Sequence, residues 1–452
     1  MRFMIVSLCL FVTLMVAPPS MAWAQTLGWT ADVGSLIDQY IDQRYEGDRA
    51  DTDLLLEGMK AAGVTRPQDL EQALRHSRAS YPDAAKLLGQ TTVHTVECQH
   101  VDYSSRYFMY VSAELDLASP VALVIVGHGG NSSMSPQRAE ATAKAYLSAY
   151  QPVANSLNAI LVAPASCRGW GQIGNSLMLS TVSKIQRTIP VDSDRIYLTG
   201  QSMGGHLSYR SALSLPDRFG AVSPHSGGYD FVAKQSIGNL INVPGYAVWG
   251  VREPYGINKD NRTNQAWAES HGLEWKFVEK NGGHEIYQDE LGKVASFFAD
   301  RPRDLYRKKV YLRSGGAMKF VKTWGIKGWP THTVLSKTKP LRWNMRHWLE
   351  VQPRPDHAEP LTIMAVNRGE NKIDITSSNV RELSIFLHPR MVDLEKPVVI
   401  TINGEQQYNA RVEIDPRLMF ELAREFDDRG RVFWAKVDLE VSTDRDVVIS
   451  SQ

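Results

Sequence analysis

The feature that most constrains this chain is a switch from strand to helix within residues 195–209, RIYLTGQSMGGHLSY. Apolar and β-branched residues lead up to Gly200, and small residues follow Ser202. A serine at so sharp a turn has a strained backbone, and its side chain projects from the end of the sheet. Gly200 and Gly204 suit this geometry, because a β-carbon at either position would meet a neighbouring strand or helix. The pattern predicts a buried strand, an exposed nucleophilic serine, and a helix that begins near Met203.

The same alternation of strands and helices extends over residues 90–300. Residues 121–126 form a continuous apolar run, which is typical of a strand that is buried on both faces. The expected strands are 92–98, 106–115, 121–126, 158–165, 195–200, 219–227, 244–250 and 273–280. Helical segments separate most of them, so this region is predicted to be an α/β domain with a mostly parallel sheet covered on both faces.

A small helical element is expected before this domain, over residues 25–89. Its first helix places apolar side chains on one face at helical spacing: Val33, Leu36, Ile37, Tyr40 and Ile41. Two readings of the element remain open, a packing appendage and a cap over an active site.

A β-rich, sandwich-like domain is expected after it, over residues 301–452. One helix is expected at 416–426, and the expected short strands are 308–314, 331–336, 361–367, 372–378, 382–389, 397–404 and 431–441. The aromatic side chains of this region would either bind a polymer or sugar or, more commonly, pack in a core: Trp324, Trp329, Trp343 and Trp348.

Residues 1–24 have the pattern of a signal peptide. Arg2 provides a positive start, an apolar run follows, and Ala22-Trp23-Ala24 forms a small-x-small cleavage site. A membrane anchor is the weaker alternative, because the apolar run is shorter than the ~20 residues of a spanning helix. We therefore expect a periplasmic or secreted protein with no stable membrane insertion. In the mature chain Cys98 and Cys167 remain, and the sequence leaves open whether they pair.

A serine nucleophile needs a base and an acid, which in this architecture follow it along the chain in the order acid, then histidine. His284 lies in the Gly-rich loop NGGHE, after an expected strand and before a helix, and is the predicted base. The acid should follow the preceding strand, which ends near Gly250. Glu253 is the first choice and Asp260 the second. The acid would hold the imidazole in the correct tautomer.

An oxyanion hole completes the expected site. The apolar strand ends in GHGG, whose glycines allow backbone N–H groups to point into the site, and Gly129 is the predicted donor. The backbone N–H of Met203 is the predicted second donor. No H-E-x-x-H, C-x-x-C or phosphate-binding loop occurs, so no metal or cofactor is expected. Lys and Arg total 50 against 49 for Asp and Glu, which argues against a nucleic-acid partner.

With these residues placed, the middle of the chain resembles the α/β-hydrolase family. The resemblance rests on GHGG, VDSDRIYLTGQSMGG, SPHSGG, VWGVRE and NGGHE, within about residues 91–300. The segment looks most like secreted esterases of the polyhydroxybutyrate-depolymerase and feruloyl-esterase type, which grade into prolyl-oligopeptidase-like catalytic domains. The resemblance implies a Ser-His-acid triad and an acyl-enzyme. The family usually has aspartate where this chain has Glu253.

The favoured hypothesis is an exported serine hydrolase that cleaves carboxylic esters of a small molecule or a polymer. Two alternatives remain open: a serine peptidase of the prolyl-oligopeptidase type, and a catalytically inert binding protein on the same fold. The absence of a propeller-like repeat before the domain favours the ester over the amide. The oligomeric state is not constrained by the sequence.

Overall fold

The computed structural model describes residues 32–42, 49–77, 81, 83–117, 119–229, 236–313, 344–353 and 360–441. The signal-type segment 1–24, the strand-like segment 331–336, and Trp324, Trp329 and Trp343 lie outside these residues. Among the helices of the described ranges, none combines the length and apolarity that crossing a membrane would require.

The central domain contains one eight-stranded sheet with the order β1-β2-β4-β3-β5-β6-β7-β8. Its strands are β1 (Thr91–Glu97), β2 (Ser104–Val111), β3 (Val121–Gly127), β4 (Ala159–Pro164), β5 (Val191–Gln201), β6 (Ala221–His225), β7 (Gly245–Gly250) and β8 (Trp275–Lys280). Strand β2 is antiparallel to β1 and β4, and the other neighbours are parallel. The predicted α/β class and mostly parallel sheet are therefore confirmed.

Helices cover both faces of this sheet. They are α5 (Pro136–Leu157), α6 (Gln172–Gln186), α7 (Met203–Ser214), α8 (Ile257–Ser270) and α9 (Gln288–Ala299), with short 3-10 turns η1 (Ala84–Leu87), η2 (Pro216–Arg218) and η3 (Ile237–Asn242). Alternate residues of β3 face opposite layers, as a strand buried on both sides requires. Val124 belongs to the same hydrophobic cluster as residues of α5 and α9, whereas Leu123 belongs to the cluster that contains residues of α6, α7 and α8.

The described residues of the C-terminal region form two sheets and one helix. The four-stranded sheet has the order β10-β11-β14-β17 and the five-stranded sheet the order β16-β15-β13-β12-β9. The elements are β9 (Lys309–Arg313), β10 (Met345–Arg346), β11 (Leu349–Pro353), β12 (Thr362–Gly369), β13 (Lys372–Ser378), β14 (Val380–Leu387), β15 (Val398–Ile402), β16 (Glu405–Ala410), α10 (Pro416–Phe426) and β17 (Ala435–Glu440). Within the described residues, the expected β-rich character of this region is confirmed.

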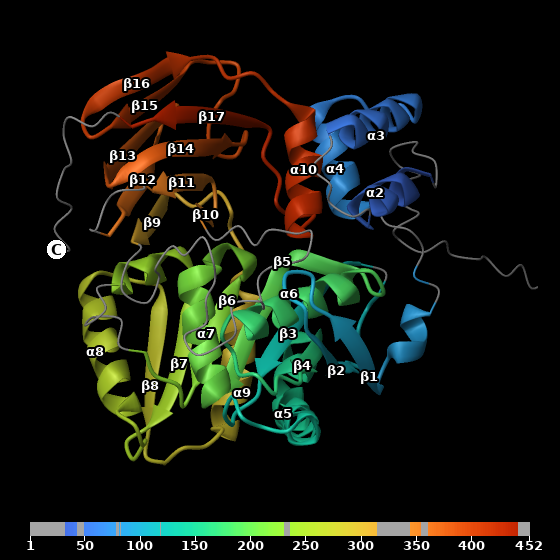
Figure 1. Cartoon of the computed structure of the whole chain (residues 1–452), viewed down its shortest axis with the longest axis vertical. Helices are drawn as coiled ribbons and strands as arrows, with labels where there is room; N and C mark the ends of the chain where they lie inside the picture. The colour runs from blue at the N-terminus through green and yellow to red at the C-terminus, as the bar shows by residue number, and fades with distance from the viewer. Residues whose placement is uncertain are drawn as a thin grey trace, which may run out of the picture.

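The N-terminal helices belong to the same body as the C-terminal sheets. Helices α2 (Asp32–Asp42), α3 (Arg49–Ala61) and α4 (Pro67–His76) pack around α10, and Figure 1 shows them beside it, on the same side of the central domain as the two C-terminal sheets. One hydrophobic core contains residues of both segments. Within it the rings of Tyr40 and Phe420 meet edge to face at 6.4 Å. Two segments far apart in the sequence thus enclose one core, with the α/β domain inserted between them.

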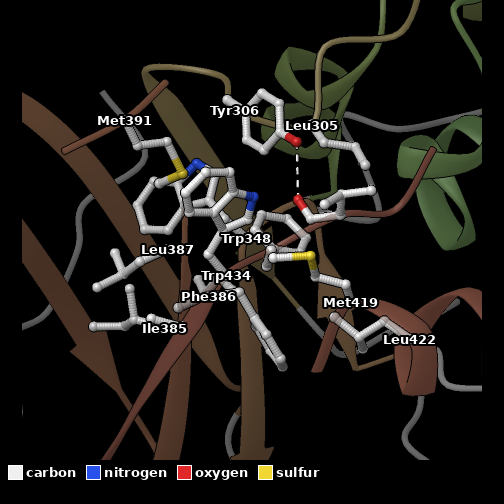
Figure 2. Close-up of a cluster of buried hydrophobic side chains, with 14 of the residues drawn as sticks. Leu305, Tyr306, Trp348, Ile385, Phe386, Leu387, Met391, Met419, Leu422 and Trp434 are labelled. Atoms are coloured by element: carbon white, nitrogen blue, oxygen red, sulfur yellow. Dashed lines mark hydrogen bonds between the residues drawn. The ribbon is translucent and has the colours of Figure 1, made fainter. Parts of the chain in front are cut away.

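Trp348 lies in this core and not on a binding surface. Its side chain is fully buried, and its indole N–H donates to the backbone oxygen of Arg307 at 2.8 Å. Figure 2 shows it among Phe386, Trp434 and Met419. Of the four tryptophans considered as polymer contacts, the one within the described residues is therefore a core residue.

A buried ionic cluster joins the two bodies at the first residues of β5. Arg303 binds Asp194 of β5 at 2.7 Å and Asp428 of the C-terminal region at 2.5 Å, and its side chain is 2% exposed. Arg431 binds Asp217 at 2.8 Å. Burial alone would raise the pKa of Asp217, but Arg431 and the neighbouring cationic groups lower it to about 2.

Two asparagines of η3 close one edge of the five-stranded sheet. Asn242 donates to the backbone oxygen of Tyr311 at 2.6 Å and accepts from the Tyr311 N–H at 3.1 Å. Asn239 makes the same pair of bonds with the backbone of Arg313. The two amides thereby occupy the position of a neighbouring strand along β9, which otherwise would present an unpaired edge.

Neither Cys98 nor Cys167 forms a disulfide bond with another described residue. Cys98 is buried in the central domain, and the Cys167 sulfur lies 3.4 Å from the hydroxyl of Tyr103. The structure thus answers the open question of their pairing in favour of two separate thiols.

Candidate active site

Ser202 occupies the tight turn between β5 and α7. Its φ of 58° and ψ of −118° are rare for a non-glycine residue, and such strain costs about 1–3 kcal/mol. A β-carbon at Gly204 would lie 1.8 Å from the backbone oxygen of Gly127, and one at Gly200 would lie 2.3 Å from the same oxygen. The expected reason for these glycines is therefore confirmed: only glycine lets β5 and α7 approach β3 this closely.

His284 reaches Ser202 from the loop after β8. Its Nε2 lies 2.7 Å from the Ser202 Oγ. The loop is held from two sides. The Tyr287 hydroxyl donates to the Gly283 oxygen at 2.6 Å, and the Ser226 hydroxyl donates to the Glu285 oxygen at 3.0 Å. The imidazole therefore has a supported position within hydrogen-bond reach of the serine.

Glu253 is the carboxylate that reaches His284. Its Oε2 lies 2.6 Å from the His284 Nδ1, and its Oε1 accepts from the Gly250 N–H at 3.2 Å. Its side chain is 0% exposed. A carboxylate only accepts, so Nδ1 carries the proton and Nε2 is free to accept from Ser202. Asp260, the second choice, lies in the first turn of α8, where its carboxylate faces Gly228.

The loop after β3 is anchored by a buried histidine. His128 donates from Nδ1 to the Gly129 oxygen at 2.7 Å, and its Nε2 accepts from the Ser166 N–H at 3.0 Å. Burial lowers the pKa of His128, which keeps the ring neutral and able to make both bonds. The Trp170 indole N–H also donates to the His128 oxygen at 2.8 Å.

This anchoring sets the direction of the next peptide. A trans peptide places its C=O and N–H on opposite sides. Because the Gly129 oxygen points inward to His128, the Gly130 N–H points away from that buried ring. Gly129 is buried, whereas Gly130 is exposed. The structure thus makes the backbone N–H of Gly130 a second candidate donor in this loop, beside that of the predicted Gly129. Met203, the other predicted donor, is the first residue of α7, so its N–H has no hydrogen-bond acceptor within the helix.

Three polar residues near the site were not identified from the sequence. The Tyr146 hydroxyl donates to the Gln201 Oε1 at 2.5 Å, directly before Ser202. The His206 Nδ1 lies 2.6 Å from the Gly228 oxygen, which ties α7 to the loop after β6. Gln201 and His206 lie in or beside the serine turn, and none of the three residues belongs to any other local motif. Tyr146 is one of several aromatic residues in a helix, so no sequence signal marks it.

The site is open to solvent among the described residues. His284 is exposed and Ser202 is partly exposed. The N-terminal helices lie elsewhere: Arg75 of α4 binds Asp194, near the first residue of β5, whereas Ser202 follows its last residue. Eleven strand residues separate the two ends by roughly 30 Å. The structure thus favours a packing appendage over a cap for the described N-terminal helices.

One known protein family matches part of the chain. Residues 177–323, less than half of the chain, match the family described as "Putative esterase", and this segment contains Ser202, Glu253 and His284. The strand order of the sheet and the serine turn after β5 give this domain the α/β-hydrolase fold. The family match and the side-chain geometry both support a hydrolase. No curated protein matches the chain.

The hydrolase domain is also similar to solved structures at low identity. A thermostable esterase is 15% identical, with a TM-score of 0.37, over 47% of this chain and 61% of its own. FphF, a fluorophosphonate-binding serine hydrolase of Staphylococcus aureus, is 13% identical, with a TM-score of 0.37, over 47% of this chain and 99% of its own. Dipeptidyl peptidase 4 of Porphyromonas gingivalis is 12% identical, with a TM-score of 0.38, over 47% of this chain and 36% of its own.

Proposed function

We propose that this protein hydrolyses carboxylic esters through an acyl-enzyme formed on Ser202. The observation that carries the proposal is the continuous hydrogen-bond chain from Ser202 through His284 to the buried Glu253, at 2.7 and 2.6 Å. A serine, a base within hydrogen-bond reach and a group that orients the base are the parts that nucleophilic acyl transfer needs.

In the first half of the reaction the Ser202 oxygen attacks the ester carbonyl while His284 Nε2 takes its proton. The C–O bond of the alcohol then breaks, and the same nitrogen returns the proton to the leaving oxygen. In the second half a water molecule attacks the acyl-enzyme with His284 again as base, which releases the acid and restores Ser202. Glu253 keeps Nδ1 protonated and stabilises the imidazolium.

Backbone N–H groups stabilise the oxyanion in both halves. Met203 provides one from the start of α7, where the positive end of the helix dipole also favours negative charge. The loop Gly129–Gly130 provides the other. Removal of one such donor typically costs about 3–4 kcal/mol, so this loop matters as much as the base does.

The open site is compatible with a bulky or polymeric ester as well as a small one. Because of the signal-type segment, we also propose export to the periplasm or the medium. Fractionation of cells that express the full chain tests the export, and an uncleaved cytoplasmic product would contradict it.

Steady-state hydrolysis of p-nitrophenyl acetate by the purified chain tests the activity. Ser202→Ala is expected to lower kcat by about 10⁴-fold or more, because the nucleophile is lost. Ser214→Ala, a serine at the other end of α7, is the matched control and should retain the wild-type rate. Hydrolysis of a chromogenic dipeptide amide in preference to the ester would point to a peptidase. No turnover of either substrate by folded protein would favour an inert binding protein.

A further inference from the structure

The hydroxyl of Tyr146, on α5, lies between the two loops that the proposed reaction needs. It donates to the Gln201 Oε1 at 2.5 Å. On its other side it lies against Gly129, where an added β-carbon would be only 2.3 Å from the phenolic oxygen and 3.3 Å from the Gln201 Oε1. One hydroxyl thus contacts the residue before the nucleophile and the first residue of the oxyanion loop.

The direction of these bonds gives the hydroxyl a bridging role. Its single proton goes to Gln201, so its oxygen is left to accept. Burial raises the pKa of Tyr146, and its contact with the backbone of Gly129 opposes that rise. The hydroxyl therefore stays neutral near pH 7, keeps its bond to Gln201 and remains in contact with Gly129.

The surroundings leave this bridge little freedom. Gln201 is 5% exposed and ends β5, so its amide has a fixed place beside Ser202. The ring of His128 meets the Tyr146 ring edge to face at 6.5 Å and holds the Gly129 oxygen. Gly129 is thereby held at its oxygen by His128 and on the other side by Tyr146, which together set the plane of the peptide that carries the Gly130 N–H.

We propose that Tyr146 is a positioning residue for the oxyanion hole: its hydroxyl fixes the distance between the Gly129–Gly130 loop and Ser202. It touches neither substrate nor the proton pathway. The inference rests on the proposed ester hydrolysis. A displacement of the loop by about 1 Å costs up to about 100-fold in rate. The N–H donors must lie within hydrogen-bond distance of the position that the oxyanion occupies in the transition state, which differs from that of the carbonyl oxygen in the bound substrate.

The first experiment measures kcat and KM for p-nitrophenyl acetate in wild type, Tyr146→Phe and Tyr150→Phe. Tyr150 is the matched control: it lies one turn further along α5, is fully buried, and stacks on Tyr146 at 6.4 Å. Tyr146→Phe is expected to lower kcat about 10- to 100-fold with KM changed less than about 2-fold, and Tyr150→Phe to retain wild-type kcat. Wild-type kcat in Tyr146→Phe would overturn the inference, as would an equal loss in both variants.

A second readout separates positioning from loss of packing. An aryl trifluoromethyl ketone adds to the serine and places its oxyanion in the hole. Its inhibition constant should rise by the same factor by which kcat/KM falls in Tyr146→Phe. The pH midpoint of kcat/KM should not move, because Tyr146 does not contact His284. An unchanged inhibition constant beside a lowered kcat, or a shifted midpoint, would contradict a role in the oxyanion hole.

Gln201→Met provides an independent route if Tyr146→Phe fails to fold. It removes the acceptor of the same hydroxyl and should show the same loss of kcat with little change of KM. The double variant should lose no more than the larger single loss, since both changes break one bridge. Full additivity, or a wild-type rate in Gln201→Met, would overturn the inference. A wild type without esterase activity would instead refute the proposed function itself.

Discussion

The two ends of strand β5 differ in their surroundings. Its first residues contact a cluster of ion pairs, whereas Ser202, which follows its last residue, is partly exposed and hydrogen-bonded to His284. At the first end Arg303 joins Asp194 to Asp428 through two ion pairs, in which Arg303 and Asp428 are buried and Asp194 is partly exposed. At the other end Ser202 has a strained backbone and an exposed partner in His284. One strand thus links the central domain to the C-terminal region at its first residues and positions Ser202 after its last. The strained and exposed end persists only because the surrounding structure over-determines it.

The two ends also differ in how their effects should appear in experiments. Changes near Ser202 should alter turnover and leave folding intact. Changes near Asp194 should alter folding and leave the turnover of the folded molecules intact, since roughly 26 Å of strand separates Asp194 from Ser202. Each of the following predictions tests one side of this division, from the largest expected effect to the smallest.

Glu253→Gln should lower kcat for the ester by about 10⁴-fold with little change in the melting temperature. The amide can donate to Nδ1, which would stabilise the wrong tautomer of His284. Asp260→Asn is the matched control from the neighbouring helix and should stay within a few-fold of wild type. A large loss in Asp260→Asn together with a small loss in Glu253→Gln would reverse the assignment of the acid.

Arg303→Met should destabilise the protein by about 3–5 kcal/mol, because it leaves Asp194 and Asp428 without their shared cation. Urea unfolding measures the loss. Arg301→Met is the control: it removes a surface pair with Glu274, 50% exposed, and should cost at most about 1 kcal/mol. The surviving folded Arg303→Met should keep the wild-type kcat. A fall of kcat in proportion to the loss of stability would contradict the separation between effects on folding near Asp194 and effects on turnover near Ser202.

The free energy of unfolding should fall as the pH falls from about 4 to 2. The folded-state pKa of Asp217 is about 2, below its unfolded value, so its contribution is present above the unfolded pKa and is lost as the pH falls through the folded one. For Asp217 alone this amounts to roughly 2 kcal/mol. The pKa of Asp428 is also lowered, because the attraction of Arg303 and its neighbours outweighs the effect of burial.

Urea unfolding at several pH values in this window measures the slope. Asp428→Asn should flatten it, since one of the titrating carboxylates is gone. A slope that is the same in wild type and Asp428→Asn would show that the ionic cluster does not govern acid stability.

Asn242→Ala should cost about 1–2 kcal/mol of stability, the smallest effect in the series. It leaves the buried N–H and C=O of Tyr311 without partners along the edge of β9. Asn409→Ala, on the exposed edge strand β16, is the control and should stay within about 0.5 kcal/mol. Equal effects in both variants would mean that the amides of η3 do not secure the contact between the two bodies.

The division between the two ends also explains what could be predicted from the sequence. The serine turn is local: the five residues Gly200–Gly204, between an apolar strand and a helix, suffice to identify Ser202. His284 follows from the same kind of local context. Glu253 and Asp260 lie in one loop, and only the folded loop distinguishes them, by bringing Glu253 to 2.6 Å from Nδ1.

Features that depend on contacts between distant segments could not be predicted. Helices α2–α4 and helix α10 share a core although the whole α/β domain separates them in the sequence, and each looks like an ordinary amphipathic helix on its own. The bridge made by Tyr146 is similar, since it joins a helix to two loops with no common motif. Strand β16 was missed because its residues are polar and mostly exposed, so it lacks the alternation that identifies a strand.

Labelling of the purified mature protein with a fluorophosphonate probe, followed by peptide mapping, tests the central claim most directly. The account predicts a single labelled peptide that contains Ser202, and no labelling in Ser202→Ala. It predicts much slower labelling in Glu253→Gln and unchanged labelling in Arg303→Met molecules that remain folded. Folded wild-type protein that takes up no label, or takes it up at another serine, would contradict the claim that Ser202 is an activated nucleophile.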